Sequence, residues 1–417
     1  MAKKAEAANT QAQLDELNSA LGSGTFIEVR RMLRSLPAPD IAHLLESSPP
    51  PARHVLWQLL DETQEGEILQ DLSDELQSQF LRSMDAREVA AATEGLEPDD
   101  VADILQQLPE KVLQEVLNSM DQQDRTRLEQ MLTYPDDTAG GLMNTDTITV
   151  RARHNMDVVL RYLRRHTEIP EMTDNLIVVN RSDRFIGLLP LRTLLVADPN
   201  ATVREMMQTD VEAIPATMGD AEVASLFERH DWVSAPVIDD EGKLLGRITI
   251  DDVVDVIRED AEHSLMSMAG LGDDEDTFAP ILKTTPRRAV WLGINLITAF
   301  IAASVINMFQ GTIDKVVALA VLMPIVASMG GIAGTQTLTV MVRGMALGHI
   351  GHSNRSWLIN REFVVGLLNG ILWSLVVAVA ASLWFDDPQI GLIIAAAMVI
   401  NLVTAAVAGT LIPLVMQ

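Results

Sequence analysis

Cysteine is absent from this chain of 417 residues. Its absence excludes a disulfide framework, a thiolate zinc site and thiol-based catalysis. The sequence also lacks a phosphate-cradling loop, a nucleophile–base pair and a zinc motif, so we expect the protein not to be an enzyme. The N-terminus, MAKKAEAANTQAQ, has no apolar stretch typical of a secretory signal. We therefore expect the front of the chain to start in the cytoplasm.

Positive charge is scarce, because 31 Lys and Arg residues stand against 58 Asp and Glu residues, for a formal net charge of -27. Nearly all of the acidic residues lie in the part of the chain that ends at Asp276. Such an acidic surface repels nucleic acid and anionic lipid and attracts cations. We therefore expect a cation as ligand and no nucleic-acid partner.

Ionisable side chains are missing from four long apolar segments in the C-terminal part, which cover residues 289–308, 316–342, 364–385 and 390–416. Each segment reaches the length of about 20 residues that a helix needs to cross a bilayer. The sequence therefore predicts a transmembrane domain with four spans over residues 287–417. A proton-coupled carrier usually keeps an ionisable group at membrane depth, and these segments give no sign of one.

Basic residues flank the apolar segments unevenly. They precede the first segment and lie between the second and the third, at Lys283, Arg287, Arg288, Arg343, Arg355 and Arg361. Positively charged flanks mark the cytoplasmic side of a membrane. This pattern predicts a multi-pass protein of the inner (cytoplasmic) membrane whose N-terminal regions are cytoplasmic.

The second apolar segment contains an irregular stretch, PIVASMGGIAGTQTLTVMVRG. Proline and closely spaced glycines weaken a helix, and irregular backbone at membrane depth is tolerated where it is buried or lines a watery cavity. We predict that this stretch lines a pore through Pro324, Gly330, Gly331, Gly334, Thr335 and Gln336. The alternative is a packing face of small residues between helices.

The cytoplasmic half contains two kinds of internal repeat. Residues 21–134 have helical periodicity with recurring phrases such as DIAHLLESSPP and DVADILQQLPE. These phrases predict an acidic, solenoid-like stack of helix pairs. Residues 1–20 are expected to be disordered.

The second repeat lies within residues 135–260, where residues 175–195 match residues 234–254 and Gly187 aligns with Gly246. Each copy has the pattern of a strand, a turn, a second strand and a helix. We therefore predict a tandem α/β module that pairs with itself.

The tandem module ends in a predicted helix rich in carboxylates, DDVVDVIREDAE. Asp251, Asp255 and Glu259 are spaced four apart and share one face, where like charges repel. Further candidates are Asp252, Asp260 and Glu262 on the same helix, and Asp99 and Asp103 in the helical domain. A bound cation would relieve this repulsion and draw the domains together. The alternative is a solvated acidic face, and the run at residues 273–276 is expected to be only an acidic loop.

Two motifs carry a resemblance to a known family. They are the junction YPDDTAGGLM, from Tyr134 to Met143, and the glycine-rich second segment. In this domain order they resemble the MgtE-type magnesium channels over the whole chain. The resemblance implies a multi-domain fold with a solenoid-like helical N domain, a tandem CBS pair, a connecting plug helix over residues 261–286 and an all-α transmembrane bundle.

The same resemblance implies a function. Members of the family form homodimers in the lipid bilayer and admit Mg2+ down its gradient. They close when cytoplasmic Mg2+ binds between the soluble domains and the helix that enters the membrane. By resemblance, Asp231 joins the candidate ligands of Mg2+.

The sequence departs from the family in two places. Ile332 stands where the family often has an asparagine in the second span. The family also has a fifth span with an ion-binding aspartate, whereas this chain stops at Gln417 after four. We therefore expect the sequence to be truncated and the main selectivity residue to lie outside it.

Other functions stay open at this point. CBS pairs often bind adenine nucleotides, and Thr249 with Asp252 forms the T-x-x-D pattern used for ribose and phosphate, so ATP is a possible second ligand. Transport of Mn2+ or Co2+ is an alternative, although the sequence offers no cluster of soft ligands. A membrane-anchored nucleotide sensor without transport is another. An ion-flux assay in liposomes with competing cations separates these alternatives.

Overall fold

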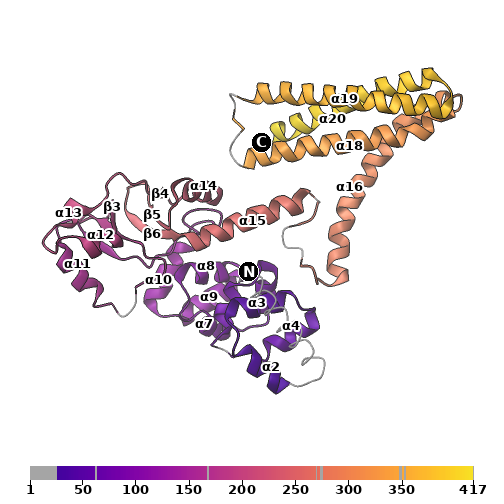
Figure 1. The fold of residues 1–417 in the computed structure, drawn as a ribbon. Helices are drawn as coiled ribbons and strands as arrows, with labels where there is room; N and C mark the ends of the chain where they lie inside the picture. Colours follow the sequence, from indigo (N-terminus) through magenta and orange to yellow (C-terminus); the bar gives the residue numbers. More distant parts are fainter. Residues whose placement is uncertain are drawn as a thin grey trace. The chain divides into compact units, whose positions relative to one another are not determined.

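The computed structural model describes residues 26–61, 63–166, 169–268, 270–272, 276–346, 350–351 and 354–416 (Figure 1). The segment expected to be disordered, residues 1–20, lies outside the described residues, as do residues 273–275 of the expected acidic loop. The chain forms two compact units, one up to Leu292 and one from Gly293 onward.

Short helices build the first part of the N-terminal unit. They are α2 (Phe26–Leu33), α3 (Ala38–Glu46), α4 (Pro50–Trp57), α5 (Glu65–Gln70), α6 (Asp74–Leu81), α7 (Ala86–Ala92), α8 (Pro98–Gln106), α9 (Glu110–Ser119) and α10 (Gln122–Met131). Proline occupies the first turn of α3, α4 and α8, where the backbone N–H has no helical partner. Asp85 and Glu88 form a capping box that begins α7. These start signals divide the segment into short helices.

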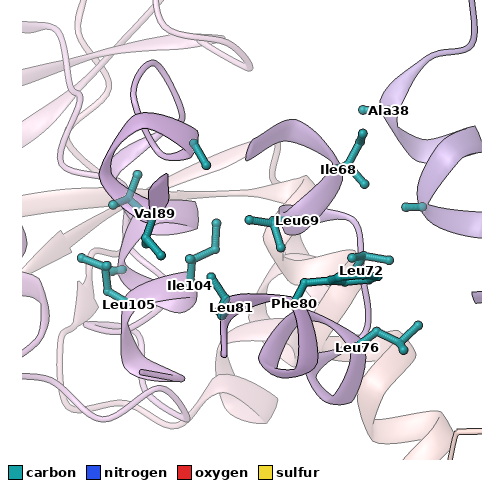
Figure 2. Close-up of a cluster of buried hydrophobic side chains, with 14 of the residues drawn as sticks. Ala38, Ile68, Leu69, Leu72, Leu76, Phe80, Leu81, Val89, Ile104 and Leu105 are labelled. Atoms are coloured by element: carbon teal, nitrogen blue, oxygen red, sulfur yellow. The ribbon is translucent and has the colours of Figure 1, made fainter. Parts of the chain in front are cut away.

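The apolar faces of these helices meet in a common core. Figure 2 shows that Leu69 of α5, Phe80 and Leu81 of α6, and Ile104 of α8 converge on one another. Each of the four is at most 3% exposed, and Phe80 stacks on Trp57 of α4 with ring centroids 4.2 Å apart. Burying one such side chain contributes about 1.5–3 kcal/mol. The predicted helical domain is confirmed.

Two small sheets follow the helical domain. Their elements are β1 (Thr149–Arg151), α11 (Met156–Leu163), β2 (Asn175–Val179), β3 (Phe185–Pro190), α12 (Leu191–Val196), α13 (Val203–Met206), β4 (Ile214–Pro215), α14 (Asp220–His230), β5 (Ser234–Ile238) and β6 (Leu244–Thr249). The strand orders are β1-β2-β3 and β4-β5-β6. In each sheet the first strand runs parallel, and the last antiparallel, to the central strand.

The two sheets share one register, as the internal repeat predicts. Gly187 and Gly246 each pair with the fourth residue of the central strand, and the same irregularity follows each pair. A Cβ atom on Gly187 would lie 2.3 Å from the carbonyl oxygen of Gln208, and one on Gly246 would lie 2.6 Å from that of Asn144. Glycine at these positions therefore lets a second backbone segment cross the strand. The predicted tandem module is confirmed.

The junction motif attaches the helical domain to the second repeat rather than to the first. The backbone N–H of Ala139 donates to Met218, and that of Gly140 donates to Ala216. Asn144 and Arg247 exchange two backbone hydrogen bonds of 2.7 and 2.9 Å. The helical domain is thereby anchored to the repeat that continues into the acidic helix.

That acidic helix is α15 (Ile250–Met268), and it follows β6 without a break. Val253 and Val256 are buried and fix its first turns on the second repeat. The predicted connecting helix is therefore not a separate element at its start, because residues 261–268 continue the same helix. Gly270 follows its end with a positive φ of 68°, where a glycine avoids strain.

Long helices make up the rest of the chain. They are α16 (Ile281–Met308), the short α17 (Gln310–Ile313), α18 (Val317–Ala346), α19 (Arg355–Phe385) and α20 (Pro388–Met416). Within the described residues, 4 helices are long and apolar enough to cross a membrane. They correspond to the four predicted spans, but the third begins at Arg355 rather than at Val364.

Helix α20 is the centre of packing in the membrane unit, because α18 and α19 both lie along it (Figure 1). A Cβ atom on Gly409 of α20 would lie only 2.7 Å from the carbonyl oxygen of Gly334 on α18. The side chain of Asn401 donates a 2.6 Å hydrogen bond to the carbonyl oxygen of Val326. Small residues and an interhelical hydrogen bond therefore hold α18 against α20.

Candidate cation-sensing site and membrane pathway

Helix α8 separates its apolar and acidic residues onto different faces. Ile104 and Leu105 are fully buried and hold the helix on the core of the helical domain. Asp99 is 5% exposed, and its Oδ1 atom has no hydrogen-bond partner among the described residues. A buried carboxylate oxygen without a donor is costly unless a cation satisfies it.

The acids of α8 have raised pKa values. Burial, and then the negative charge of Asp252 on α15, raise the pKa of Asp99 well above its ordinary value. Burial, followed by nearby carboxylates, raises the pKa of Asp100 to about 7. Asp103 keeps contact with solvent, yet desolvation by the surrounding protein and then Asp100 raise its pKa to about 8. The charged forms are thus disfavoured in this arrangement.

Helix α15 supplies the opposing carboxylates. Burial, and then Asp251, raise the pKa of Asp252 to about 7, although hydrogen bonds from Thr249 act in the other direction. Burial, and then the charge of Asp74, raise the pKa of Glu259. Asp255 lies 3.1 Å from Arg258 in an exposed ion pair. We call the facing acids of α8 and α15 the acidic cluster: Asp99, Asp100, Asp103, Asp251, Asp252, Asp255 and Glu259.

The sequence prediction did not include Asp100, which belongs to the cluster, or three further carboxylates that border it. Desolvation by the surrounding protein raises the pKa of Asp71, Glu97 and Asp136, although Asp71 and Asp136 keep contact with solvent, and the charge of Asp255 adds to the effect on Asp71. Asp136 lies in the junction motif, which could have drawn attention to it. Glu97 stands two residues before Asp99 in the run EPDD, which is a second local signal. Asp71 has no such signal, because only the tertiary contact brings it near α15.

Three predicted ligands lie outside the acidic cluster. Asp231, which has a left-handed backbone conformation at the end of α14, lines a large cavity of the tandem module instead. Asp260 and Glu262 are exposed further along α15. Glu262 reaches the cluster only through its charge, which adds to the raised pKa of Glu259.

The acidic cluster offers carboxylate oxygens, which are the ligands that Mg2+ and Ca2+ take in proteins. No group of three or more His, Asp or Glu side chains within the described part of the chain is close enough to hold a bare metal ion. Mg2+ usually keeps several waters and binds through one or two carboxylates. The unpartnered Oδ1 of Asp99 and the raised pKa of its neighbours fit such an ion, because its charge would favour the ionised carboxylates.

The structure places the predicted nucleotide residues inside the contact between domains. Thr249 donates a 2.9 Å hydrogen bond from its hydroxyl to Asp252. Neither residue is among those that line the large cavity of about 990 Å³. That cavity is bordered by the end of β3, the segment before β4 and the turn after α14, where His230 stacks on Trp232 at 4.8 Å. The cavity and the T-x-x-D residues are therefore separate features of the module.

The predicted pore residues divide between two faces of α18. Pro324, Gly331, Thr335 and Gln336 are exposed in the chain as described. Gly330 and Gly334 instead face α20: a Cβ atom on Gly330 would lie 2.3 Å from the side chain of Asn401. For these two glycines the alternative of a packing face therefore holds, because their missing side chains let the helices approach.

A buried carboxylate in the N-terminal part of α19 was not singled out from the sequence. Glu362 on α19 is buried; Arg361 lies 2.5 Å from it, and the hydroxyl of Thr337 on α18 lies 3.4 Å from it. The helix thus starts before the predicted span of residues 364–385, which itself contains no ionisable side chain, and Arg361 and Glu362 lie in this N-terminal extension. Arg361 and Glu362 lower the local hydropathy, which moved the apparent start of the span to Val364. The continuous helix could have been inferred from the unbroken sequence REFVVGLL, which lacks Pro and Gly before Gly366.

Comparison with known proteins supplies the family. Residues 36–137 match the MgtE intracellular N domain, residues 203–259 match a CBS domain, and residues 323–417 match the family described as divalent cation transporter. The magnesium transporter MgtE of Bacillus subtilis (strain 168) is 27% identical, over 95% of this chain and 88% of its own length. That of Thermus thermophilus is 28% identical, over 96% of this chain and 90% of its own length.

The chain belongs to the MgtE family. Among solved structures, a crystal structure of the cytosolic domain of the Mg2+ channel MgtE in complex with ATP is 33% identical, with a TM-score of 0.53. It covers 58% of this chain and 99% of that chain. The soluble part of a magnesium transporter, 22% identical with a TM-score of 0.51, shares the fold. The resemblance inferred from the junction motif and the second span is thus confirmed.

Proposed function

We propose that this protein conducts Mg2+ across the cytoplasmic membrane and that cytoplasmic Mg2+ closes it. The MgtE relatives named as magnesium transporters support the cargo. The acidic cluster supports the regulation, because α8 and α15 oppose carboxylates whose pKa values reach about 7 at Asp252 and about 8 at Asp103. This opposition of acids across two domains is the observation that carries the regulatory part.

Closure follows from electrostatics. Without a cation, burial and like charge disfavour the contact between α8 and α15. A hydrated Mg2+ beside Asp99 and Asp252 would neutralise this charge and favour the contact. Because α15 is continuous to Met268, a movement of its acidic half is carried to its end, close in sequence to the first span. The two states then differ in their affinity for Mg2+, as allosteric control requires.

Conduction would use the exposed face of α18. Pro324, Gly331, Thr335 and Gln336 provide small or uncharged polar groups, which can touch a partly hydrated ion without holding it. A homodimer would place two such faces opposite each other. The protein would be oriented in the membrane so that the acidic cluster is on the cytoplasmic side, as the basic residues that flank the spans indicate.

Flux through the full-length chain in liposomes tests the regulatory part. The triple variant Asp252→Asn, Asp255→Asn and Glu259→Gln removes charge from the cluster without changing side-chain size. We expect it to keep conducting when Mg2+ is present on the cytoplasmic side, with flux about fivefold or more above that of the closed parent protein.

The matched control is the double variant Asp260→Asn and Glu262→Gln, which changes the same helix outside the cluster. It should close as the parent protein does. Parent-like closure of the triple variant would contradict the proposal. Competition with Mn2+, Co2+ and Ca2+ in the same assay tests the cargo, and absence of any flux would favour a sensor without transport.

ATP binding to the large cavity is a second proposal. It is supported by the cavity of about 990 Å³, by the stacked pair His230 and Trp232 beside it, and by the relative whose cytosolic domain was crystallised with ATP. Thermal-shift titration of the full chain with ATP tests it. We expect the shift to be lost in Trp232→Ala and kept in Thr249→Val. A shift that is kept in Trp232→Ala and lost in Thr249→Val would show that ATP binds at the T-x-x-D pattern instead.

A further inference from the structure

Arg53 is a buried cation at the edge of the helical domain. Its side chain is 1% exposed. Nε donates to the carbonyl oxygen of Leu45 at 2.8 Å, and Nη2 donates to that of Glu46 at 3.0 Å. The guanidinium therefore binds the last two carbonyls of α3, of which that of Leu45 also accepts from the backbone N–H of Ser48. These two bonds do not neutralise its charge.

The charge is neutralised by a residue far along the chain. Nη1 and Nη2 of Arg53 donate to the two carboxylate oxygens of Asp276, at 2.5 and 2.9 Å. Asp276 follows α15 in the segment that leads to the first span, and its side chain is 12% exposed. The two planar groups form a bidentate pair, which is geometrically specific. Asp276, the last residue of the expected acidic loop, is thus bound to the helical domain.

Other contacts secure the same segment. The guanidinium carbon of Arg53 lies 5.7 Å from the ring centroid of Phe278, within the range of a cation–π interaction. The backbone N–H of Asp276 donates to Glu75 at 3.4 Å, and Glu75 lies 3.9 Å from Arg287 on α16. The helical domain therefore contacts the chain both after α15 and at the beginning of α16.

We infer that the pair of Arg53 and Asp276 is a gating tether, through which the helical domain holds the chain's entry into the membrane independently of Mg2+. Removing one partner of a buried ion pair leaves an uncompensated charge, so the pair is expected to persist while the acidic cluster opens and closes. The helical domain then pivots on a fixed point, and its movement at α8 reaches the membrane entry by a second route besides α15. This inference rests on the proposed function, because a tether can gate only a conductor that cytoplasmic Mg2+ closes.

The test uses the full-length protein in liposomes with the variant Asp276→Asn, which keeps the size of the side chain but removes its charge. Asp240→Asn, at an exposed turn, is the control. We expect residual flux in the presence of cytoplasmic Mg2+ to rise about fivefold or more in Asp276→Asn, within the usual range of allosteric coupling. Glu75→Gln, which weakens the second contact, should change flux in the same direction by a smaller factor.

A second readout separates the tether from the sensor. Arg258 lies on α15 beside the acidic cluster, so its cleavage by trypsin reports whether Mg2+ closes that contact. We expect Mg2+ to protect Arg258 in Asp276→Asn as in the parent protein. Loss of this protection together with closure would overturn the tether, because it would show general damage to the domain.

Two further outcomes are distinguishable. If the parent protein closes with Mg2+ and both Asp276→Asn and Glu75→Gln close equally well, the tether is refuted and the proposed function stands. If flux through the parent protein does not depend on cytoplasmic Mg2+, the proposed function fails and the tether fails with it.

Discussion

The cytoplasmic unit and the membrane unit treat charge in opposite ways. In the cytoplasmic unit, carboxylates from α8 and α15 face one another, and the pKa of Asp103 reaches about 8. In the membrane unit, the exposed face of α18 offers Gly331 and Thr335, while the carboxylate of Glu362 is buried and paired. A sensor needs charge that a cation must balance. A conduit needs polar groups that release the ion again.

The largest predicted effect is that the contact between α8 and α15 depends on pH, whereas the stability of the membrane unit does not. A pH dependence shared by both units would break the contrast. In the folded protein the pKa values of Asp100, Asp103 and Asp252 are raised to about 7, 8 and 7 from 3.8. Between about pH 4 and pH 8 the folded state therefore binds more protons than the unfolded state, and the free energy of unfolding falls as pH rises.

Protease protection of α15, measured without Mg2+ across this pH range, checks the prediction. Protection should be present at pH 5 and lost toward pH 8.5, and Mg2+ should restore it at the higher pH. Release of protons on addition of Mg2+ is expected only at lower pH, where these carboxylates are still protonated. Protection that rises with pH in the absence of Mg2+ would contradict the account. Thermal stability of the membrane unit should change little over the same range.

Neutralising Asp99 should stabilise the contact between α8 and α15 without Mg2+ and should reduce the effect of Mg2+ on that contact. Asp99→Asn removes a carboxyl group that must take up a proton when it is buried against Asp252. At a pH at which Asp99 is ionised in the open state, the contact without Mg2+ should therefore gain about 1–3 kcal/mol, and the extra protection given by Mg2+ should shrink. The variant Asp260→Asn, at an exposed position of α15, should change neither. Protease protection with and without Mg2+ measures both effects. Equal responses of the two variants would show that the burial of Asp99 does not matter.

Buried pairing in the membrane unit predicts a loss of stability rather than a loss of sensing. Glu362→Ala should lower the free energy of unfolding in detergent by about 1–3 kcal/mol, because Arg361 and Thr337 lose their acceptor. Glu362→Gln keeps an acceptor oxygen and should cost less. Thermal unfolding of the purified variants measures the difference. Closure by Mg2+ should be retained in Glu362→Gln, and its loss would place this carboxylate in the sensor.

The same substitution, glycine to alanine, gives a finer comparison when it is made once in the interface between α18 and α20 and once on the exposed face of α18. In Gly409→Ala the new Cβ would lie 2.7 Å from the backbone oxygen of Gly334, so overpacking should cost about 1–2 kcal/mol. Gly331→Ala meets no described atom within 4 Å, and its better helix propensity should add up to about 1 kcal/mol. When flux is normalised to the amount of folded protein, only Gly331→Ala should show a reduction. If Gly409→Ala stayed stable and were the only one of the two variants with reduced flux, the assignment of the packing face and the pore face would have to be exchanged.

The sequence predicted the elements of this molecule better than their contacts. The length of the apolar segments located the membrane helices, and the match of residues 175–195 with 234–254 located the tandem module. Both signals are local. The bounds of the third span were missed because Arg361 and Glu362 interrupt the apolar pattern while the helix continues.

Contacts between distant segments left no such pattern. The spacing of Asp99 and Asp103 marked an acidic face, but Asp71 lies beside the cluster only because of the folded contact with α15. Arg53 could not be connected with Asp276 from the sequence, because the two are separated by 223 positions. The glycines of α18 indicated close approach without telling which of them meet α20 and which stay exposed.

The most direct test of the regulation is the distance between the helical domain and α15, measured with and without Mg2+. The chain has no cysteine, so spin labels can be placed at Lys111→Cys on the helical domain and Leu265→Cys on α15, both exposed positions. Electron paramagnetic resonance on the full-length protein should give one short, narrow distance with Mg2+ and a longer, broader distribution without it. The triple variant of the acidic cluster should show no dependence on Mg2+. A distance in the parent protein that is the same with and without Mg2+ would contradict the central claim.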